Sequence, residues 1–192
     1  MTATDLARTV AGREVPAAGT YVIDPAHSSI EALARHLVFS KVRGRFSRFG
    51  GEIVVAEDVE VSSVTVEIDA ASVDSREEQR DAHLRSGDFL DVERWPTLRF
   101  SSTSVQRRDD GGWTVTGDLT IRDVTRSVDL VVDYLGSGPD PWGNVKAAFS
   151  ATTQLDREAF GITWNQALET GGVLVGKTLK VELEIQASRQ AE

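Results

Sequence analysis

The residues that could do chemistry in this chain are few. It contains no cysteine and only three histidines, His27, His36 and His83. Without thiols, a disulfide, a thiolate zinc site and a cysteine nucleophile are all excluded. The histidines could bind a metal only by converging with a carboxylate such as Asp81, and no HxH or HExxH spacing brings them together. We expect no metal, and hydrogen-bonded structural roles for the histidines, with His36 able to reach the interior.

A serine triad is the other chemistry to test, because Asp24, His27 and Ser28 lie close in sequence. Adjacent residues of a strand point to opposite faces, so His27 and Ser28 cannot readily face each other, and no GxSxG turn is present. The glycine pair at 171–172 lacks the Lys-Ser/Thr of a phosphate-binding loop. The sequence therefore predicts no catalytic residue, no cofactor and no enzymatic activity.

Arginine and lysine side chains gather in the segment between residues 41 and 48. These are Lys41, Arg43, Arg45 and Arg48. Such a cluster is commonly a solvated strand face. It could also hold the polar or anionic end of a ligand at the mouth of a cavity, with Arg43 and Arg45 as contacts. Arg157 is a third candidate for that role, although a structural pair with Asp156 fits it equally well.

The elements that must position these residues are strands. Two-residue alternation of apolar and polar side chains, the pattern of a strand with one buried face, dominates from Tyr21 onward. The apolar sets include Ile30/Ala32/Ala34/His36, Val64/Val66/Ile68, Leu98/Phe100, Val115/Gly117/Leu119/Ile121, Val128/Leu130/Val132, Val145/Ala147/Phe149/Ala151 and Leu179/Val181/Leu183/Ile185. With a segment ending near Ile53, this gives about eight strands, and many short antiparallel strands form a sandwich or close into a barrel.

Three stretches depart from the strand pattern. Residues 75–92 are charged and predict a short helical insertion, with Ser75 as cap and Glu78 completing a capping box. Residues 156–176 are rich in aromatic residues and glycine, and could cover the mouth of the barrel. Residues 1–19 form an N-terminal extension that could hold one short helix capped by Thr4 or Asp5, followed by the barrel domain at 20–188.

Length and charge narrow the class of protein. A chain of 192 residues fits one domain with its own core. The formal net charge of −9, from 30 acidic and 21 basic residues, argues against nucleic acid and against membrane docking through charge. No signal segment and no run of about 20 apolar residues is evident, so we expect a cytoplasmic protein without stable membrane insertion.

The interior of an eight-stranded barrel is either filled by side chains or holds one small ligand. Small residues on the apolar faces, such as Ala32, Ala34, Gly117, Ala147 and Ala151, favour a cavity, because a solid core would carry larger side chains. The alternative is a solid barrel in which Phe39, Phe46 and Phe49 fill the space.

Four motifs carry a family resemblance from Gly19 to about Gln186. They read GTYVIDPAHSSIEALARHLVFSKVRGRFSRFGGEI, SVDSREEQRDAHLRSGDFLDVERWPTLRFSST, GDLTIRDVTRSVDL and LDREAFGITWNQALETGGVLVGKTLKVELEI. The chain thereby resembles the YceI-like, polyisoprenoid-binding family. That resemblance implies an all-β fold, an extended, lipocalin-like, eight-stranded antiparallel β-barrel that binds a polyprenyl compound, a quinone or a fatty-acid derivative. It also implies a homodimer.

These observations predict a lipid carrier or reservoir, with an enzyme acting on such a lipid and a solid interaction module as alternatives. The residues expected along the apolar tunnel are Ile30, Ala32, Ala34, His36, Phe39, Phe46, Phe49, Val64, Val66, Ile68, Phe89, Phe100, Leu119, Ile121, Leu130, Val132, Phe149, Phe160 and Trp164.

Overall fold

The structure, a computed structural model, describes residues 6–37, 40–168 and 173–191. Its strands are β1 (Ala7–Val10), β2 (Arg13–Pro16), β3 (Gly19–Ile23), β4 (Ser29–His36), β5 (Ser40–Phe46), β6 (Phe49–Val55), β7 (Ser63–Asp69), β8 (Val73–Asp74), β9 (Thr97–Arg107), β10 (Trp113–Ile121), β11 (Val124–Pro139), β12 (Val145–Asp156) and β13 (Val175–Arg189). One α-helix, α1 (Glu78–Arg85), and short 3-10 turns at Pro25–His27, Val59–Val61, Ala70–Ser72 and Arg157–Phe160 complete it.

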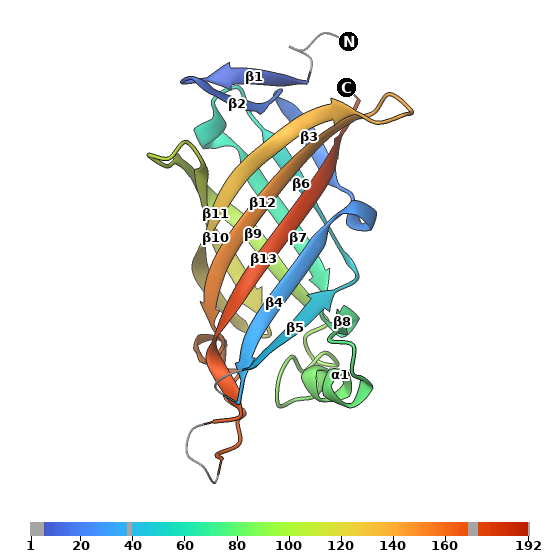
Figure 1. Ribbon diagram of the computed structural model, residues 1–192, viewed down its shortest axis with the longest axis vertical. Coiled ribbons are helices and arrows are strands. Elements are labelled where there is room, and N and C mark those ends of the chain that lie inside the picture. The colour runs from blue at the N-terminus through green and yellow to red at the C-terminus, as the bar shows by residue number, and fades with distance from the viewer. Residues whose placement is uncertain (1–5, 38–39, 169–172, 192) are drawn as a thin grey trace.

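The strands close into a barrel (Figure 1). The sheet runs in the order β12-β11-β10-β9-β7-β6-β3-β13, and β12 pairs again with β13, which seals the ring. All pairings are antiparallel. The predicted eight-stranded antiparallel barrel is therefore confirmed, and closure leaves few free strand edges.

Two stretches of the barrel wall are long strands that bend partway along. β3 and β4 form one bent strand interrupted by the turn at Pro25–His27, and β13 pairs with β3 near Ala187 and with β4 nearer Leu179. β5 and β6 form the next, and β5 pairs with β8 through only two residue pairs. Below that short pairing, the barrel wall beside β5 is completed by the segment that carries α1 (Figure 1).

The N-terminal extension holds a β-hairpin, where we expected at most a short helix. β1 and β2 pair antiparallel, and Ala11 and Gly12 between them both have positive φ, at 47° and 79°. Two left-handed residues in succession are the geometry of a tight hairpin turn that matches the twist of its strands. In Figure 1 this hairpin crosses the upper end of the barrel.

The helical insertion is confirmed, but its cap is Glu77, where we predicted Ser75. The Glu77 carboxylate accepts hydrogen bonds from the backbone N–H groups of Gln79 and Arg80, at 3.1 and 2.6 Å. Ser75 does not cap because its hydroxyl donates to the buried carboxylate of Asp81 and accepts from Arg80 Nε. In the described part of the chain, no helix is long and apolar enough to cross a membrane.

The buried residues form clusters at the two ends of the barrel. One cluster, with Val15, Val105 and Trp113, packs under the hairpin at the upper end. Another, with Phe89 and Phe160, packs against the α1 segment at the lower end. The apolar faces predicted from alternation point inward on every strand that lines the interior, so these two packed ends bracket the middle of the barrel.

Candidate functional site

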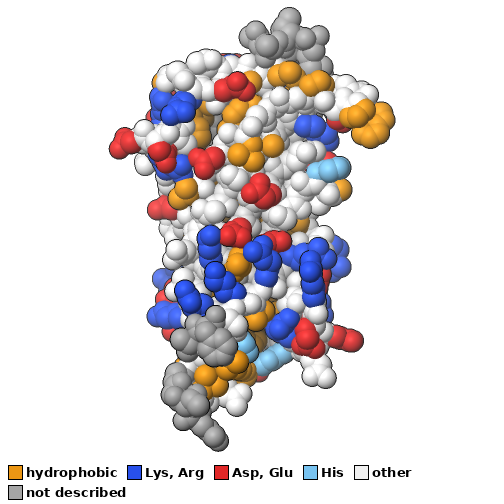
Figure 2. Space-filling view, in the orientation of Figure 1, with side chains coloured by type: hydrophobic (Ala, Val, Ile, Leu, Met, Phe, Trp, Pro, Cys, Tyr) orange, Lys and Arg blue, Asp and Glu red, His pale blue; other side chains and the backbone are white. Residues whose placement is uncertain are grey.

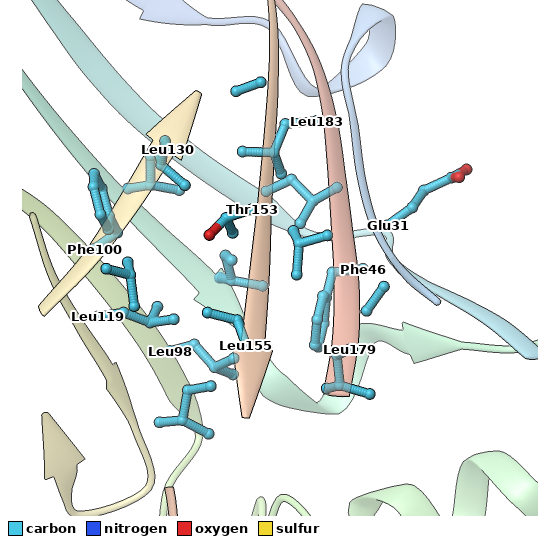
Figure 3. Close-up of a pocket in the computed structure, with 18 of the residues that line it drawn as sticks. Glu31, Phe46, Leu98, Phe100, Leu119, Leu130, Thr153, Leu155, Leu179 and Leu183 are labelled. Carbon is cyan, nitrogen blue, oxygen red and sulfur yellow. The ribbon is translucent and has the colours of Figure 1, made fainter. Parts of the chain in front are cut away.

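A cavity of about 720 Å³ lies inside the barrel and is bounded almost entirely by apolar side chains. In Figure 3, Phe100, Leu119 and Leu130 face Leu179 and Leu183 across it. This volume falls within the range of pockets that hold a small organic ligand, roughly 300–1,000 Å³. The described side chains leave this volume unfilled, which favours a ligand-binding barrel over the solid-cored alternative.

The side chains in the middle of the wall show the cavity directly. Leu119, Leu130, Val181 and Leu183 point inward, yet each is only half-buried. In a close-packed core such residues would be almost fully covered by their neighbours. Their remaining exposed surface is surface that faces the cavity.

Most of the predicted tunnel residues do line the cavity. They are Ile30, Ala32, Ala34, His36, Phe46, Val64, Val66, Ile68, Phe89, Phe100, Leu119, Ile121, Leu130, Val132, Phe149 and Trp164. Strand parity places fourteen of them there, since every second residue of a strand faces the same side. Phe89 and Trp164 lie outside the strands, in the segments after α1 and after β12. Whether they contact a ligand stays a prediction.

Phe49 and Phe160 do not line this cavity. Phe49 follows the break between β5 and β6 and borders a separate, shallower depression with Arg48 and Thr65. Phe160 ends the 3-10 turn after β12 and is 3% exposed, packed within the lower-end cluster. Phe39 lies outside the described residues.

Two of the small residues that favoured a cavity serve another purpose. A Cβ on Gly117 would lie 2.4 Å from the Phe100 ring, so this glycine makes room for that ring. Ala147 is 1% exposed and packs with Tyr21 and Ala187 above the cavity. Ala32, Ala34 and Ala151 do border the cavity, as expected.

Polar side chains on the cavity wall concentrate at the lower end. His36 comes from the end of β4, and Gln79, Arg80 and His83 come from α1. Arg80 is held by Ser75, to whose hydroxyl and carbonyl oxygens it donates at 2.6 and 2.7 Å. The lower end of the cavity is therefore its polar end.

An aromatic cluster joins α1 to the segment after β12. His83 packs edge-to-face on Trp164 and on Phe89, with ring centroids 4.5 and 4.9 Å apart. Trp164 and Phe89 lie 5.3 Å from each other, and His83 Nε2 is 2.9 Å from the Asp88 carboxylate. These rings cover the lower end of the cavity from one side.

Arg157 lines the cavity but acts as a structural anchor. It is 3% exposed and donates to the carbonyl oxygens of Ile162, Trp164 and Gly176 at 2.7, 2.9 and 3.0 Å, with a longer contact to Val175. Burial lowers the pKa of its guanidinium, because desolvation disfavours the charged form. The expected pair with Asp156 is replaced by Lys177, which contacts that carboxylate at 3.1 Å.

Arg43 and Arg45 lie on the outside of the barrel, contrary to the head-group prediction. Val42, Gly44 and Phe46 face the cavity, so the residues between them face solvent. Arg43 pairs with Glu31, and Arg45 pairs with Asp74 at 2.9 Å. In Figure 3 the Glu31 carboxylate points away from the cavity, and Figure 2 shows the resulting band of basic side chains on the lower half of this face.

The other residues weighed for chemistry are also placed structurally. His27 contacts the Asp24 carboxylate at 3.0 Å, and both lie at the bend between β3 and β4. The Ser28 hydroxyl accepts from the Gln186 N–H at 2.9 Å and ties that bend to β13. Among the described residues, no group of three or more His, Cys, Asp or Glu could hold a metal.

The tunnel prediction also missed residues that the structure places on the wall. Leu179, Val181, Leu183 and Ile185 line it from β13, and their strict alternation was a usable signal. Val15 and Pro16 of the hairpin, Tyr134 and Thr153 are further members. The Tyr134 hydroxyl is 2.6 Å from Ser137 Oγ, and burial raises the pKa of this phenol.

A closed antiparallel barrel around a long apolar cavity defines the class of this protein. Residues 21–187 match the family model of the YceI-like domain, so the chain belongs to the YceI-like family. It is 40% identical to a UPF0312 protein of Vibrio vulnificus over 163 residues, covering 83% of this chain and 86% of that one. A UPF0312 protein of Shewanella denitrificans is 38% identical over 176 residues, covering 90% and 89%.

Solved structures agree on the fold. Burkholderia cenocepacia BcnA superimposes with a TM-score of 0.74 at 20% identity, covering 85% of this chain and 98% of that one. A polyisoprenoid-binding domain of Saccharophagus degradans, implicated in plant cell wall breakdown, superimposes with a TM-score of 0.64 at 11% identity, covering 88% and 98%. At these identities the likeness establishes the barrel architecture alone.

Proposed function

We propose that this protein binds one long-chain amphiphilic lipid in its barrel and carries or stores it without chemical change. The ligand class is a polyisoprenoid, an isoprenoid quinone or a fatty-acid derivative. The observation that carries the proposal is the cavity of about 720 Å³ inside the barrel, which is lined mostly by apolar side chains and has polar side chains gathered at one end.

The energetics of the cavity support an apolar occupant. Burying apolar surface contributes roughly 25 cal/mol per Å², and the half-buried inward residues offer such surface on all sides. Water in the middle of the cavity would find few polar partners, since Thr153 is the polar side chain that lines it there. A hydrocarbon tail matches this lining.

The polar lower end gives the ligand a direction. Its tail would lie along Phe100, Leu119 and Leu183, and its head group would lie near His36, Gln79 and Arg80. A chain with a polar group at one end can satisfy both environments, whereas a wholly polar or wholly apolar molecule satisfies one. The family membership and the likeness to the polyisoprenoid-binding domain of Saccharophagus degradans agree with a polyisoprenoid.

Catalysis finds less support in the same side chains. Ser75, Arg80 and Arg157 on the wall are engaged in hydrogen bonds that hold the fold. A general acid or base must lie within hydrogen-bond reach of a reacting group. The Ser75 hydroxyl does donate to the Asp81 carboxylate, but it also accepts from Arg80 Nε, and these bonds hold the start of α1. A binding role therefore explains the cavity with fewer assumptions.

Solvent extraction of the purified protein followed by mass spectrometry tests the proposal. We expect a long-chain lipid at close to one molecule per barrel. Delipidated protein should gain thermal stability when a prenol or fatty acid is added, because a ligand that binds only the folded state raises its melting temperature. Absence of both signals would contradict lipid binding.

The substitution Leu183→Arg examines the cavity itself. It places a cation on the inward face of β13 (Figure 3), where a bound tail would desolvate it. An uncompensated buried charge costs about 3–5 kcal/mol, so lipid affinity should fall by at least about 100-fold. Glu184→Arg is the matched control, since the neighbouring side chain is exposed and points outward. Equal affinity in both variants would show that the tail does not pass β13.

A homodimer and a cytoplasmic location, expected from the sequence, stay predictions. Size-exclusion chromatography with light scattering addresses the first, and cell fractionation the second.

A further inference from the structure

The β1–β2 hairpin lies across the end of the barrel opposite the polar groups (Figure 1). It precedes residue 21, where the match to the family model begins. The hairpin is therefore a feature of this chain that the family model does not describe.

The inner face of the hairpin is part of the cavity wall. Val15 and Pro16 border the cavity, and Val15 is 1% exposed. Val15 packs with Val105 and Trp113, which border the cavity from β9 and β10. Glu14, which precedes Val15 on the same strand, is exposed. The hairpin thus closes the upper end with tightly packed apolar side chains.

Hydrogen bonds hold the hairpin to two loops of the upper rim, one after β6 and one between β9 and β10. Arg8 donates to the carbonyl oxygens of Ala56 and Glu57, after β6. Arg107 of β9 donates to the carbonyl oxygen of Ala11 at 2.9 Å, and Arg13 donates to that of Asp110 at 3.2 Å. These contacts anchor the hairpin to the upper rim of the barrel.

We propose that the hairpin is the floor of the cavity and that Val15 and Pro16 set the greatest tail length the protein accepts. The inference rests on the proposed lipid-binding function and adds a specificity for the length of the lipid tail. A tail that enters head-last from the polar end gains contacts with each added carbon until it reaches Val15. Beyond that point an extra carbon must displace close-packed side chains or push the head group out of its polar surroundings.

A homologous series of straight-chain fatty acids measures this limit. Each acid competes with a fluorescent fatty acid for delipidated, full-length protein. Affinity should rise about fourfold for each added methylene, the value for full burial, and then stop rising at one chain length. This break, the chain length at which affinity stops rising, measures where the hairpin ends the cavity.

Two conservative substitutions should move the break in opposite directions. Val15→Ala deepens the cavity and should shift the break to tails about one or two carbons longer, whereas Val15→Ile should shift it to shorter tails. Glu14→Ala is the control, because its side chain is exposed on the same strand, and it should leave the break unchanged. Near-ultraviolet circular dichroism verifies that each variant keeps its packing.

Photo-crosslinking supplies a second measurement that needs no variant. A fatty acid of the limiting length, with a diazirine at its terminal carbon, should label the peptide that contains Val15 and Pro16. Labelling of α1 instead would reverse the orientation and overturn the proposal. So would an unchanged break in both Val15 variants alongside normal binding. Failure of the unsubstituted protein to bind any acid, prenol or quinone would contradict the proposed function, and the floor with it.

Discussion

The two ends of the barrel are built differently. At the upper end, Val15, Val105 and Trp113 are each less than a tenth exposed and meet under the hairpin. At the lower end, His36, His83 and Trp164 keep part of their surface open to solvent, and the wall beside β5 is completed by a helical segment rather than by a strand. The upper end is closed by one apolar cluster, whereas the lower end is closed by polar and aromatic side chains from separate segments.

This difference indicates through which end a ligand would enter and leave. Opening the upper end would expose a well-packed cluster and break hydrogen bonds from three arginines, Arg8, Arg13 and Arg107. Opening the lower end beside α1 would separate two half-buried rings, His83 and Trp164, from the buried ring of Phe89. Local opening occurs most readily where few buried apolar contacts must be given up. The comparison predicts that upper-end substitutions cost stability, whereas lower-end substitutions change ligand release.

Trp113→Ala should have the largest effect and should act on stability. Its ring is 9% exposed within the upper cluster. Removing a buried Trp side chain costs about 3–5 kcal/mol, so the urea midpoint should fall steeply. The rate at which bound lipid leaves the folded variant should stay within about threefold of the unsubstituted rate. Much faster release without lost stability would show that the upper end is also an exit.

Arg157→Ala should come next, and it separates anchoring from head-group binding. The variant leaves the buried carbonyl oxygen of Ile162 and the partly buried carbonyl oxygens of Trp164 and Gly176 without this donor. Unsatisfied buried acceptors cost about 1–3 kcal/mol each before water enters, so we expect a loss of about 2–3 kcal/mol by thermal unfolding. Arg157→Lys should recover little, because an ammonium lacks the planar fork of donors.

The lipid affinities of the same variant test the alternative, in which Arg157 contacts the head group directly. An anchor should affect lipids with neutral and anionic head groups alike, since the whole lower end loosens. A direct head-group contact would instead make Arg157→Ala lose affinity for fatty acids and spare prenols. Such selectivity would restore Arg157 to the role first assigned from the sequence.

The features that the sequence predicted correctly are the strand faces, which follow from the local alternation of apolar and polar residues. Alternation along Leu179–Ile185 places four side chains on one face, and this held on every wall strand because strand geometry forces it. The same rule shows why Arg45 and Phe46 could not both face the cavity. They are neighbours on β5, and Phe46 is the one that lines it.

The parts that were missed depend on short or distant contacts. β1 and β2 have four residues each, too few for alternation to stand out from the extension around them. Arg157 is fixed by carbonyl groups as far along the chain as Gly176, and no spacing in the sequence reports that a carbonyl lies near a guanidinium. The sequence therefore predicted the residues on the strand walls of the cavity, but not the structures at its two ends.

Trp164→Ala should have the smallest effect on stability and the clearest effect on release. The ring contacts His83 at 4.5 Å and Phe89 at 5.3 Å and keeps part of its surface exposed. Losing these ring pairs costs about 0.5–1.5 kcal/mol, which corresponds to release faster by up to about tenfold if the cluster must part to free the ligand. Transfer of a fluorescent fatty acid to acceptor vesicles, followed by stopped flow, measures that rate. Trp142→Ala is the matched control, because Trp142 is 84% exposed on the β11–β12 hairpin, away from α1. Should both tryptophan variants release lipid at the unsubstituted rate, the ligand does not leave past the aromatic cluster, and the distinction between a sealed end and a yielding end would fail.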